Sequence, residues 1–220
     1  MDIGISIGYR DADLSNPLKG LSTFSDLYIF EPRNATDDNM VISDTVGSAV
    51  TMQQTTEALR PTLSGRYLTL GANNNDPRGI TTSQSITFKE VFIVCEYTLS
   101  TFSNFATLIN NGAGAERITG NNGTDDLITT NAIHDTGLIR LNNATETATD
   151  ILPFNLSVLH SCTDFTTPLD ISDTMTIGYN TAVGSRAWLG RLGAVIFSRI
   201  ALGEPKRKEI VNAMRRYHNI

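Results

Sequence analysis

The stretch WLGRLGAVIFSRIALGEPKRKEIVNAMRRYHNI, residues 188–220, decides the fold class of this chain. Its first part is an apolar run typical of a β-strand, and beyond Gly203 the apolar residues recur with the spacing of an amphipathic helix. Pro205 suits the first turn of that helix, because the N–H that proline lacks would have no partner there. One face of the helix, predicted over about 204–217, carries Ile210, Val211, Met214 and Tyr217. Such a helix must cover an apolar surface, so we expect it to fold back over an edge or a face of the preceding strands.

The rest of the chain is rich in short strand candidates separated by turns that contain Pro, Asn and Gly. We predict strands within 25–32, 39–46, 66–71, 85–99, 105–112, 116–123, 126–133, 137–143, 152–162, 173–180 and 186–199. The segment 85–99 gives the strongest signal and is expected to form one long strand, while 105–112 and 116–123 are expected to form a hairpin. Runs at these intervals are typical of β-sandwiches. The expected core includes Phe92, Val94, Trp188, Val195 and Phe197, with strand alternation turning some of them outward.

Length and composition favour one globular domain. The chain has 220 residues, of which 40% are hydrophobic and 18% are charged, and all-β sandwiches commonly reach this size as one unit. We therefore predict an all-β fold, an antiparallel β-sandwich with one short C-terminal α-helix, as a single domain over 1–220. The signals are weakest over 1–60.

Charge and cysteine content exclude several classes of protein. The net charge is −6, and Lys and Arg form no long block outside the last helix, so we expect no nucleic-acid partner. No stretch approaches the roughly 18 apolar residues of a membrane span, and MDIGISIGYRDAD has no signal-peptide pattern, so we expect no membrane contact and synthesis in the cytoplasm. Cys95 and Cys162 lie in apolar segments and are expected to be buried thiols rather than a disulfide.

A family resemblance enters at the same stretch. The pattern consists of a Trp-x-Gly strand, a short Leu-Gly turn and a charged helix with a Tyr-containing tail, and it is carried by Trp188, Gly190, Leu192, Val195, Ile196, Phe197, Leu202, Gly203, Ile210, Met214 and Tyr217. It resembles the C-terminal part of the concanavalin A-like lectin/glucanase (laminin G-like) domains of phage virion and bacterial surface proteins. YRDADLS (9–15), LRPTL (59–63) and ITFKEVFIVCEY (86–97) resemble further parts of that family, although Tyr9 stands where Trp is usual. The resemblance implies a jelly-roll sandwich of two antiparallel sheets, and it implies no particular activity.

Glycan cleavage on this fold would need two carboxylates that share one face of a strand and flank the scissile bond. The pattern Glu-x-Asp-x-Glu is absent from the sequence. The nearest pairs are Glu90 with Glu96, whose spacing differs, and Asp125 with Asp126, which lie in a predicted turn. The three histidines are not accompanied by the nucleophile turn of a Ser-His-Asp hydrolase. We therefore expect no enzymatic activity, with an endoglycosidase as a minor alternative.

Metal binding stays open at two loops. NNNDPRG (73–79) and NNGTDD (121–126) offer the oxygen ligands that Ca²⁺ takes, but Asn, Asp and Gly are also what tight turns require. Ordinary turns are favoured, so we predict no cofactor and leave calcium open. A zinc site is not expected, since the chain has three His and no closely spaced Cys pair.

Sugar binding usually stacks an aromatic ring on the sugar and holds the hydroxyls with Asn, Asp or Arg. Trp188 is the only Trp, and a packing role is favoured over a ligand platform because it lies in a predicted strand. The candidate glycan contacts are Trp188, Tyr179, Asn121, Asn122 and Asp125.

These observations lead to an expected function. We expect a non-enzymatic virion structural protein of a tailed phage, as a head decoration or a tail or fibre component, that acts as a protein- or glycan-interaction module. Its expected partners are other virion proteins, in a homo-oligomer or lattice, and a host surface glycan. The alternative is a carbohydrate-binding adhesin domain. The basic helix surface formed by Lys206–Lys208, Arg215 and Arg216 either docks on an acidic partner or is a solvated face.

Overall fold

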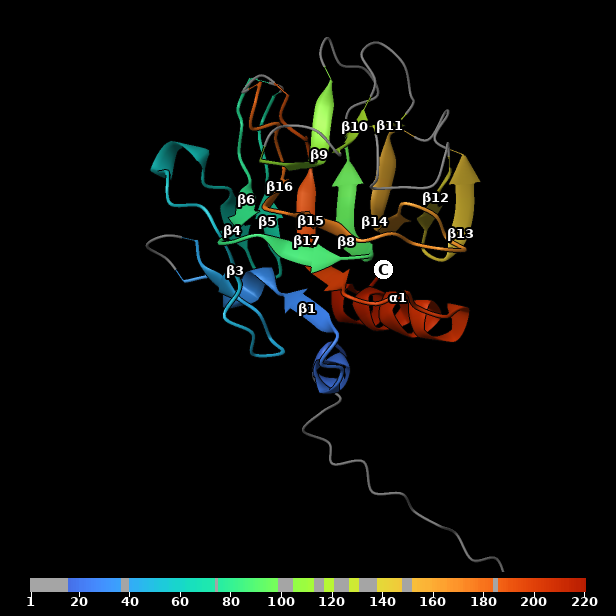
Figure 1. Cartoon of the computed structure of the whole chain (residues 1–220). Coiled ribbons are helices and arrows are strands. Elements are labelled where there is room, and N and C mark those ends of the chain that lie inside the picture. Colours follow the sequence, from blue (N-terminus) through green and yellow to red (C-terminus); the bar gives the residue numbers. More distant parts are fainter. Residues whose placement is uncertain are drawn as a thin grey trace, which may run out of the picture.

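The computed structural model describes residues 16–36, 40–73, 75–98, 105–112, 117–120, 127–130, 138–147, 152–183 and 186–220. Within these residues, two antiparallel sheets enclose an apolar core, and the helix α1 (Glu204–His218) covers the outer face of one of them (Figure 1). The predicted all-β sandwich with a C-terminal helix is therefore confirmed, and its layers are compatible with a jelly roll.

The first sheet lies next to the helix and has eight strands. In spatial order they are β13 (Ala144–Thr147), β12 (Leu138–Leu141), β14 (Phe154–Cys162), β8 (Glu90–Tyr97), β17 (Arg191–Ser198), β5 (Tyr67–Thr69) and β4 (Thr62–Ser64), with β1 (Leu27–Phe30) also paired to β17. The long strands β8, β14 and β17 form the centre of this sheet. Their side chains pack into the core on one face and beneath α1 on the other.

The second sheet has seven strands and closes the other side of the core. Its order is β11 (Leu127–Thr130), β10 (Arg117–Gly120), β9 (Ala106–Asn111), β16 (Met175–Ile177), β6 (Ile80–Thr82), β3 (Thr51–Gln53) and β2 (Ile42–Ser43). A two-stranded pair of β15 (Ile171–Asp173) and β7 (Ile86–Phe88) and the short 3-10 helices η1 (Lys19–Thr23), η2 (Pro32–Asn34) and η3 (Glu57–Leu59) complete the described elements. The pairing of β9 with β10 confirms the predicted hairpin.

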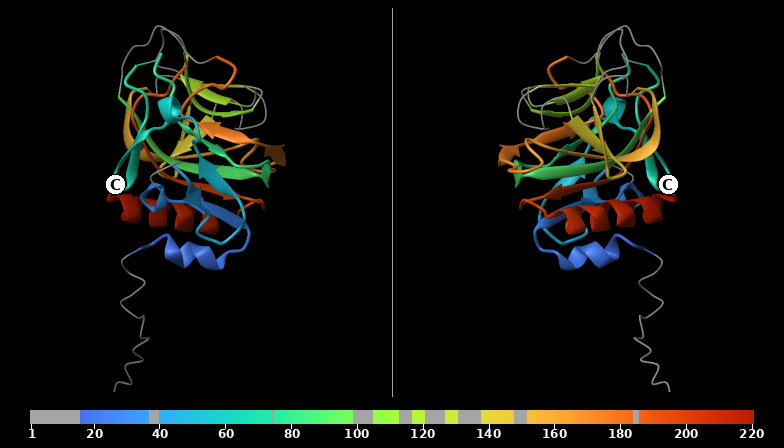
Figure 2. Two further views of the ribbon diagram at one scale, coloured as in Figure 1. Left: turned by 90° about the vertical axis from the view of Figure 1, so that its left-hand side faces the viewer. Right: turned by 90° about the vertical axis from the view of Figure 1, so that its right-hand side faces the viewer.

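At its centre, the first sheet is buried on both faces. Val195 and Phe197 point into the core between the sheets, together with Trp188. Phe92 and Val94 point the other way, into a second apolar cluster beneath α1 and η1, and Figure 2 shows these two helices side by side on that face. All five predicted core residues are therefore buried, because alternation turns some of them toward the helix layer and none toward solvent.

Two strand boundaries differ from the prediction. The segment 85–99 forms two strands in separate sheets, since β7 pairs with β15 while β8 joins the first sheet. The break falls at Lys89, whose Nζ turns outward to Asp170 at 3.1 Å. Trp188 lies before β17 rather than in it, because the chain bends at Gly190, where φ is 142° and a Cβ would lie 2.5 Å from the carbonyl oxygen of Glu96.

Candidate functional site

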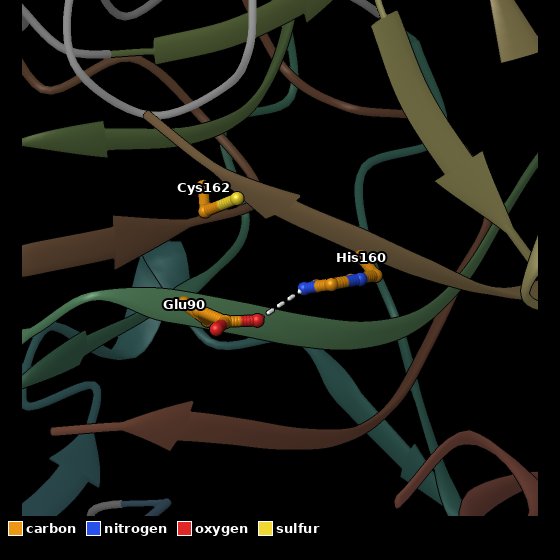
Figure 3. Close-up of side chains that lie close together, drawn as sticks. All are labelled: Glu90, His160 and Cys162. Atoms are coloured by element: carbon orange, nitrogen blue, oxygen red, sulfur yellow. Dashed lines mark hydrogen bonds and ion pairs between the residues drawn. The ribbon is translucent and has the colours of Figure 1, made fainter. Parts of the chain in front are cut away.

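A buried cluster of charged and polar side chains lies between the first sheet and the start of α1. Glu90 is the first residue of β8, His160 lies near the end of β14, and Arg207 belongs to the first turn of α1. The exposed fraction of these residues is 0, 1 and 4%. Figure 3 shows Glu90 and His160 pointing toward one another, with Cys162 nearby. Buried charges of this kind require partners, so the hydrogen bonds decide what the cluster does.

Both carboxylate oxygens of Glu90 are fully used. Oε1 accepts hydrogen bonds from the Leu202 amide at 2.6 Å and from Nη2 of Arg207 at 3.0 Å. Oε2 accepts from Nε of Arg207 at 2.9 Å and from Nε2 of His160 at 2.8 Å. Burial raises the pKa of Glu90, but these hydrogen bonds outweigh burial and hold its pKa below the ordinary value. Glu90 is therefore an ionised carboxylate that binds the segment leading into α1 and the helix itself.

His160 is neutral and held in one tautomer. Its ring stacks on Phe92 with centroids 4.1 Å apart and an interplanar angle of 8°. Burial lowers its pKa, and the nearby hydrogen bond to Glu90 offsets this only in part. Since an ionised carboxylate can only accept, Nε2 of His160 carries the proton of the shared bond.

Cys162 gives the cluster the side-chain types of a metal site. Ligand atoms of Glu90, His160 and Cys162 all lie within 4.8 Å of one another. The guanidinium of Arg207, however, already donates hydrogen bonds to both oxygens of Glu90. A cation placed here would lie beside that positive charge. The arrangement therefore fits an ion-pair network that holds α1 on the sheet, and it does not fit a metal centre.

This ion-pair network extends to the edge of the sheet. Nη1 of Arg207 donates to Glu204 at 2.7 Å, and Glu204 also accepts from Arg140 of β12 at 2.7 Å. The start of α1 is thus linked to β8, β14 and β12. The prediction that Arg207 belongs to the exposed basic surface of the helix is wrong, since its side chain is buried. Position 207 shares the inward face with Met214, and the buried Glu90 provides its partner.

A second set of contacts holds the other end of α1. The guanidinium groups of Arg33 and Arg66 lie over the ring of Tyr217, at 5.1 and 4.7 Å from its centroid. Nε2 of His218 accepts the backbone amide of Ala194 in β17 at 3.1 Å. Burial, with a smaller contribution from the charge of Arg66, lowers the pKa of His218 to about 3, so its ring stays neutral. The helix is therefore fixed to the sheet at both ends.

An open hollow lies at the opposite ends of β8 and β14. It has a volume of about 340 Å³ and is lined by Glu96, Tyr97, Thr98, Pro153, Phe154 and Asn155. Phe154 is half-buried, while Thr98 and Asn155 are exposed. This hollow combines part of an aromatic ring with hydroxyl, amide and carboxylate groups. We call it the strand-end pocket.

A second hollow lies at the end of α1. It has a volume of about 380 Å³ and is lined by Asn212, Arg215, Arg216 and Ile220. Lys206 belongs to the same basic surface, but it pairs with Glu209 at 3.0 Å. Cations near the last turn of a helix also complement its dipole, so this basic end has a structural explanation of its own.

The structure describes two of the five predicted glycan contacts, Trp188 and Tyr179. The Trp188 ring is fully buried, and its Nε1 donates to the carbonyl oxygen of Glu96 at 2.8 Å, so the favoured packing role is the one observed. Tyr179 is half-buried. The backbone amide of Trp188 donates a hydrogen bond to the carbonyl oxygen of Gly178, the residue before Tyr179, at 2.7 Å. Asn121, Asn122 and Asp125 lie outside the described residues, as does the loop 121–126 proposed for calcium.

The other calcium candidate is an ordinary turn where it is described. Asp76 accepts the Ala72 amide at 3.0 Å and pairs with Arg78 at 2.9 Å, and Asn73 accepts the Asn75 amide at 2.9 Å. These side chains are used to shape the loop. Cys95 and Cys162 are free and buried, as predicted.

Comparison of the chain with known protein families, with curated proteins and with solved structures gives no match. The resemblance to concanavalin A-like domains therefore depends on the residue pattern and on the compatible sandwich fold. Among the residues that the structure describes, no helix has both the length and the apolar composition needed to cross a bilayer.

Proposed function

We propose that this chain is a non-enzymatic interaction module with a concanavalin A-like sandwich, serving as a structural protein of a tailed-phage virion, either as a head decoration or as a tail or fibre component. One observation carries the proposal. Among the residues that bear the family resemblance, Trp188, Leu192 and Phe197 lie in the core between the sheets, and Ile196, Ile210, Met214 and Tyr217 lie in the layer beneath the helix.

The buried cluster supports a structural rather than a catalytic role. Glu90, His160 and Cys162 have side chains of the types that act in catalysis, but all three are buried. Both carboxylate oxygens of Glu90 accept hydrogen bonds that hold α1 and the segment before it. A carboxylate that acts on a substrate needs access to it. What this arrangement yields is a rigid body whose surface is available for contacts.

Repeated protein contacts suit that surface. Non-permanent interfaces are scarcely more apolar than the remaining surface of a protein, so a polar exterior is compatible with binding to other virion proteins or to further copies of this chain. The proposed partners are therefore virion proteins, in a homo-oligomer or a lattice. The proposed location of the protein is the virion.

The proposal is tested by recovery of the chain on particles. Phage particles purified by density gradient from cells that express the chain are washed and probed for it, while the isolated protein is examined by light scattering. We expect the chain on the particles in a fixed ratio to the major head or tail protein. A strict monomer that is never recovered with particles would contradict the proposal.

A carbohydrate-binding adhesin domain is the second candidate function, and the strand-end pocket favours it. A glycan array distinguishes it from a module that binds protein alone. An endoglycosidase, the minor alternative, would release reducing sugar from a β-glucan panel, and this release would be lost on substitution of one Glu or Asp.

A further inference from the structure

We propose that the strand-end pocket binds one neutral pyranose ring. This inference rests on the carbohydrate-binding function named above as the second candidate, and it identifies the site and the class of sugar. The pocket is formed by the last residues of β8 and the first residues of β14, together with Thr98 and Pro153 beside them. Its volume of about 340 Å³ lies near the lower end of the range for small-molecule sites, which is roughly 300–1,000 Å³.

The aromatic wall of the pocket is rigid. Phe154 packs on Trp188 with ring centroids 6.1 Å apart, and Trp188 packs edge to face on Tyr97 at 4.6 Å. The indole Nε1 of Trp188 is also fixed by the carbonyl oxygen of Glu96. The partly exposed ring of Phe154 is thus held by a buried neighbour, as a stacking surface for the C–H face of a sugar requires.

The rim of the pocket is polar. Thr98 contributes a hydroxyl, and Asn155 contributes an amide that can both donate and accept hydrogen bonds. Both residues are exposed, so these groups are available to a ligand. A purely apolar ligand would displace water from them without replacing its hydrogen bonds, whereas a ring with one apolar face and a hydroxylated edge satisfies both kinds of surface.

The one charged side chain among the described residues that line the pocket, Glu96, is neutralised by an ion pair with Arg191, which does not line the pocket. The carboxylate of Glu96 forms a two-point ion pair with Arg191, with Nε to Oε1 at 2.7 Å and Nη2 to Oε2 at 2.8 Å. The guanidinium of Arg191 also lies 5.0 Å from the ring centroid of Tyr67, which helps to hold it in place. A charged sugar would therefore compete with a formed pair, while a neutral sugar leaves the pair intact and can use its outer lone pairs.

The test titrates the isotopically labelled full chain with methyl glycosides of glucose, galactose, mannose and N-acetylglucosamine, and follows backbone amide shifts by NMR. Glucuronic acid and glucosamine serve as charged probes, and cyclohexanol serves as an apolar probe. We expect saturable binding of at least one neutral glycoside with a millimolar dissociation constant, as suits a ligand of about a dozen non-hydrogen atoms. The shifted amides should centre on residues 96–98 and 154–155.

Three substitutions test the assignment. Phe154→Ala should weaken binding about tenfold through loss of the ring contact, and Phe154→Tyr should retain it. Asn155→Ala should weaken binding about fivefold through loss of a hydrogen bond. Asn155 is exposed, so this variant tests the site without disturbing the core that Phe154 contacts. Asn212→Ala, in the basic hollow on α1, is the matched control and should bind as the unchanged chain does.

The outcomes separate the site from the function. Binding that is unaffected by Asn155→Ala and shifts amides elsewhere would overturn the pocket and leave carbohydrate binding standing. Tighter binding of a charged probe than of any neutral glycoside would overturn the assignment of a neutral ligand. No binding of any sugar would overturn both the pocket and the carbohydrate-binding candidate, while recovery of the chain on virions would be unaffected.

Discussion

Replacement of Arg207 by Met tests whether the buried cluster holds the helix. The substitution keeps an apolar chain of similar length and removes the guanidinium that donates to Glu90 at 2.9 and 3.0 Å and to Glu204 at 2.7 Å. Glu90 is then left as a buried carboxylate with His160 and the Leu202 amide as its remaining donors. The free energy of unfolding should fall by about 3–5 kcal/mol, the range for removing one member of a buried ion pair.

Urea unfolding at pH 7 measures this change. The fluorescence of Trp188, the only Trp and a fully buried one, reports the core, and far-ultraviolet circular dichroism reports the whole chain. Arg216→Met is the matched control, since Arg216 is exposed on the same helix and should change stability by less than about 0.5 kcal/mol. In the double variant Glu90→Gln/Arg207→Met, the loss should be smaller than the sum of the single losses by about 2 kcal/mol, because the uncompensated charge is gone.

Two results would refute this reasoning. A loss below about 1 kcal/mol for Arg207→Met would show that solvent or relaxation compensates Glu90. Additive losses in the double variant would show that Glu90 and Arg207 act independently. The two residues would then not form a coupled ion pair that holds α1 on the sheet.

Three further predictions follow from other parts of the structure. The pKa values of His160 and His218 are lowered in the folded protein, so below about pH 6.5 the unfolded chain binds protons that the folded chain does not. The free energy of unfolding should therefore fall as the pH falls below 6.5, by up to about 1.4 kcal/mol per pH unit for each histidine until the pKa of that histidine in the folded protein is reached, which is about 3 for His218. His218→Gln should flatten this slope, and an unchanged slope would contradict the account. Phe197→Ala should lower the free energy of unfolding by about 3–5 kcal/mol, since Phe197 packs on Phe88 and Phe30, and a loss below about 1 kcal/mol in urea unfolding would contradict its place in the core. Cys95 and Cys162 should resist a thiol reagent in the native state and react in urea, because burial raises both pKa values; rapid native labelling would show that the strands open.

The sequence was most informative where local rules are strong. Pro205 and the apolar spacing of Ile210 and Met214 predicted the helix over about 204–217, and the structure has it at Glu204–His218. The apolar runs around Phe92 and Val195 predicted central strands. These features depend on neighbouring residues alone, so no long-range contact was needed to recognise them.

The missed features depend on contacts between distant segments. The break at Lys89 arises because β7 and β8 find partners in different sheets, which local alternation does not reveal. Strands of three residues, such as β4 and β6, carry too few residues for a periodic signal. Their pairing is decided by the neighbours that they meet in the folded chain.

The candidate sites were missed for a related reason. Arg207 has the helical spacing of Ile210 and Met214, and Glu90 begins the apolar strand β8. Each pattern by itself indicates a buried charge, which requires a partner. Only the fold brings the two together. The strand-end pocket likewise joins residues 96–98 to 153–155 through the pairing of β8 with β14. The sequence drew attention instead to Trp188, which is buried against the half-buried ring of Phe154.

The most direct test of the proposed function is to locate the protein on particles. Purified virions from a culture that expresses the chain are labelled with a gold-conjugated antibody against it and examined by negative-stain electron microscopy. The account predicts gold at regular positions on the head, tail or fibres, and none on particles from a strain that lacks the gene. Unlabelled particles from the expressing culture, with the protein found only in the free fraction, would contradict the claim that it is a virion component.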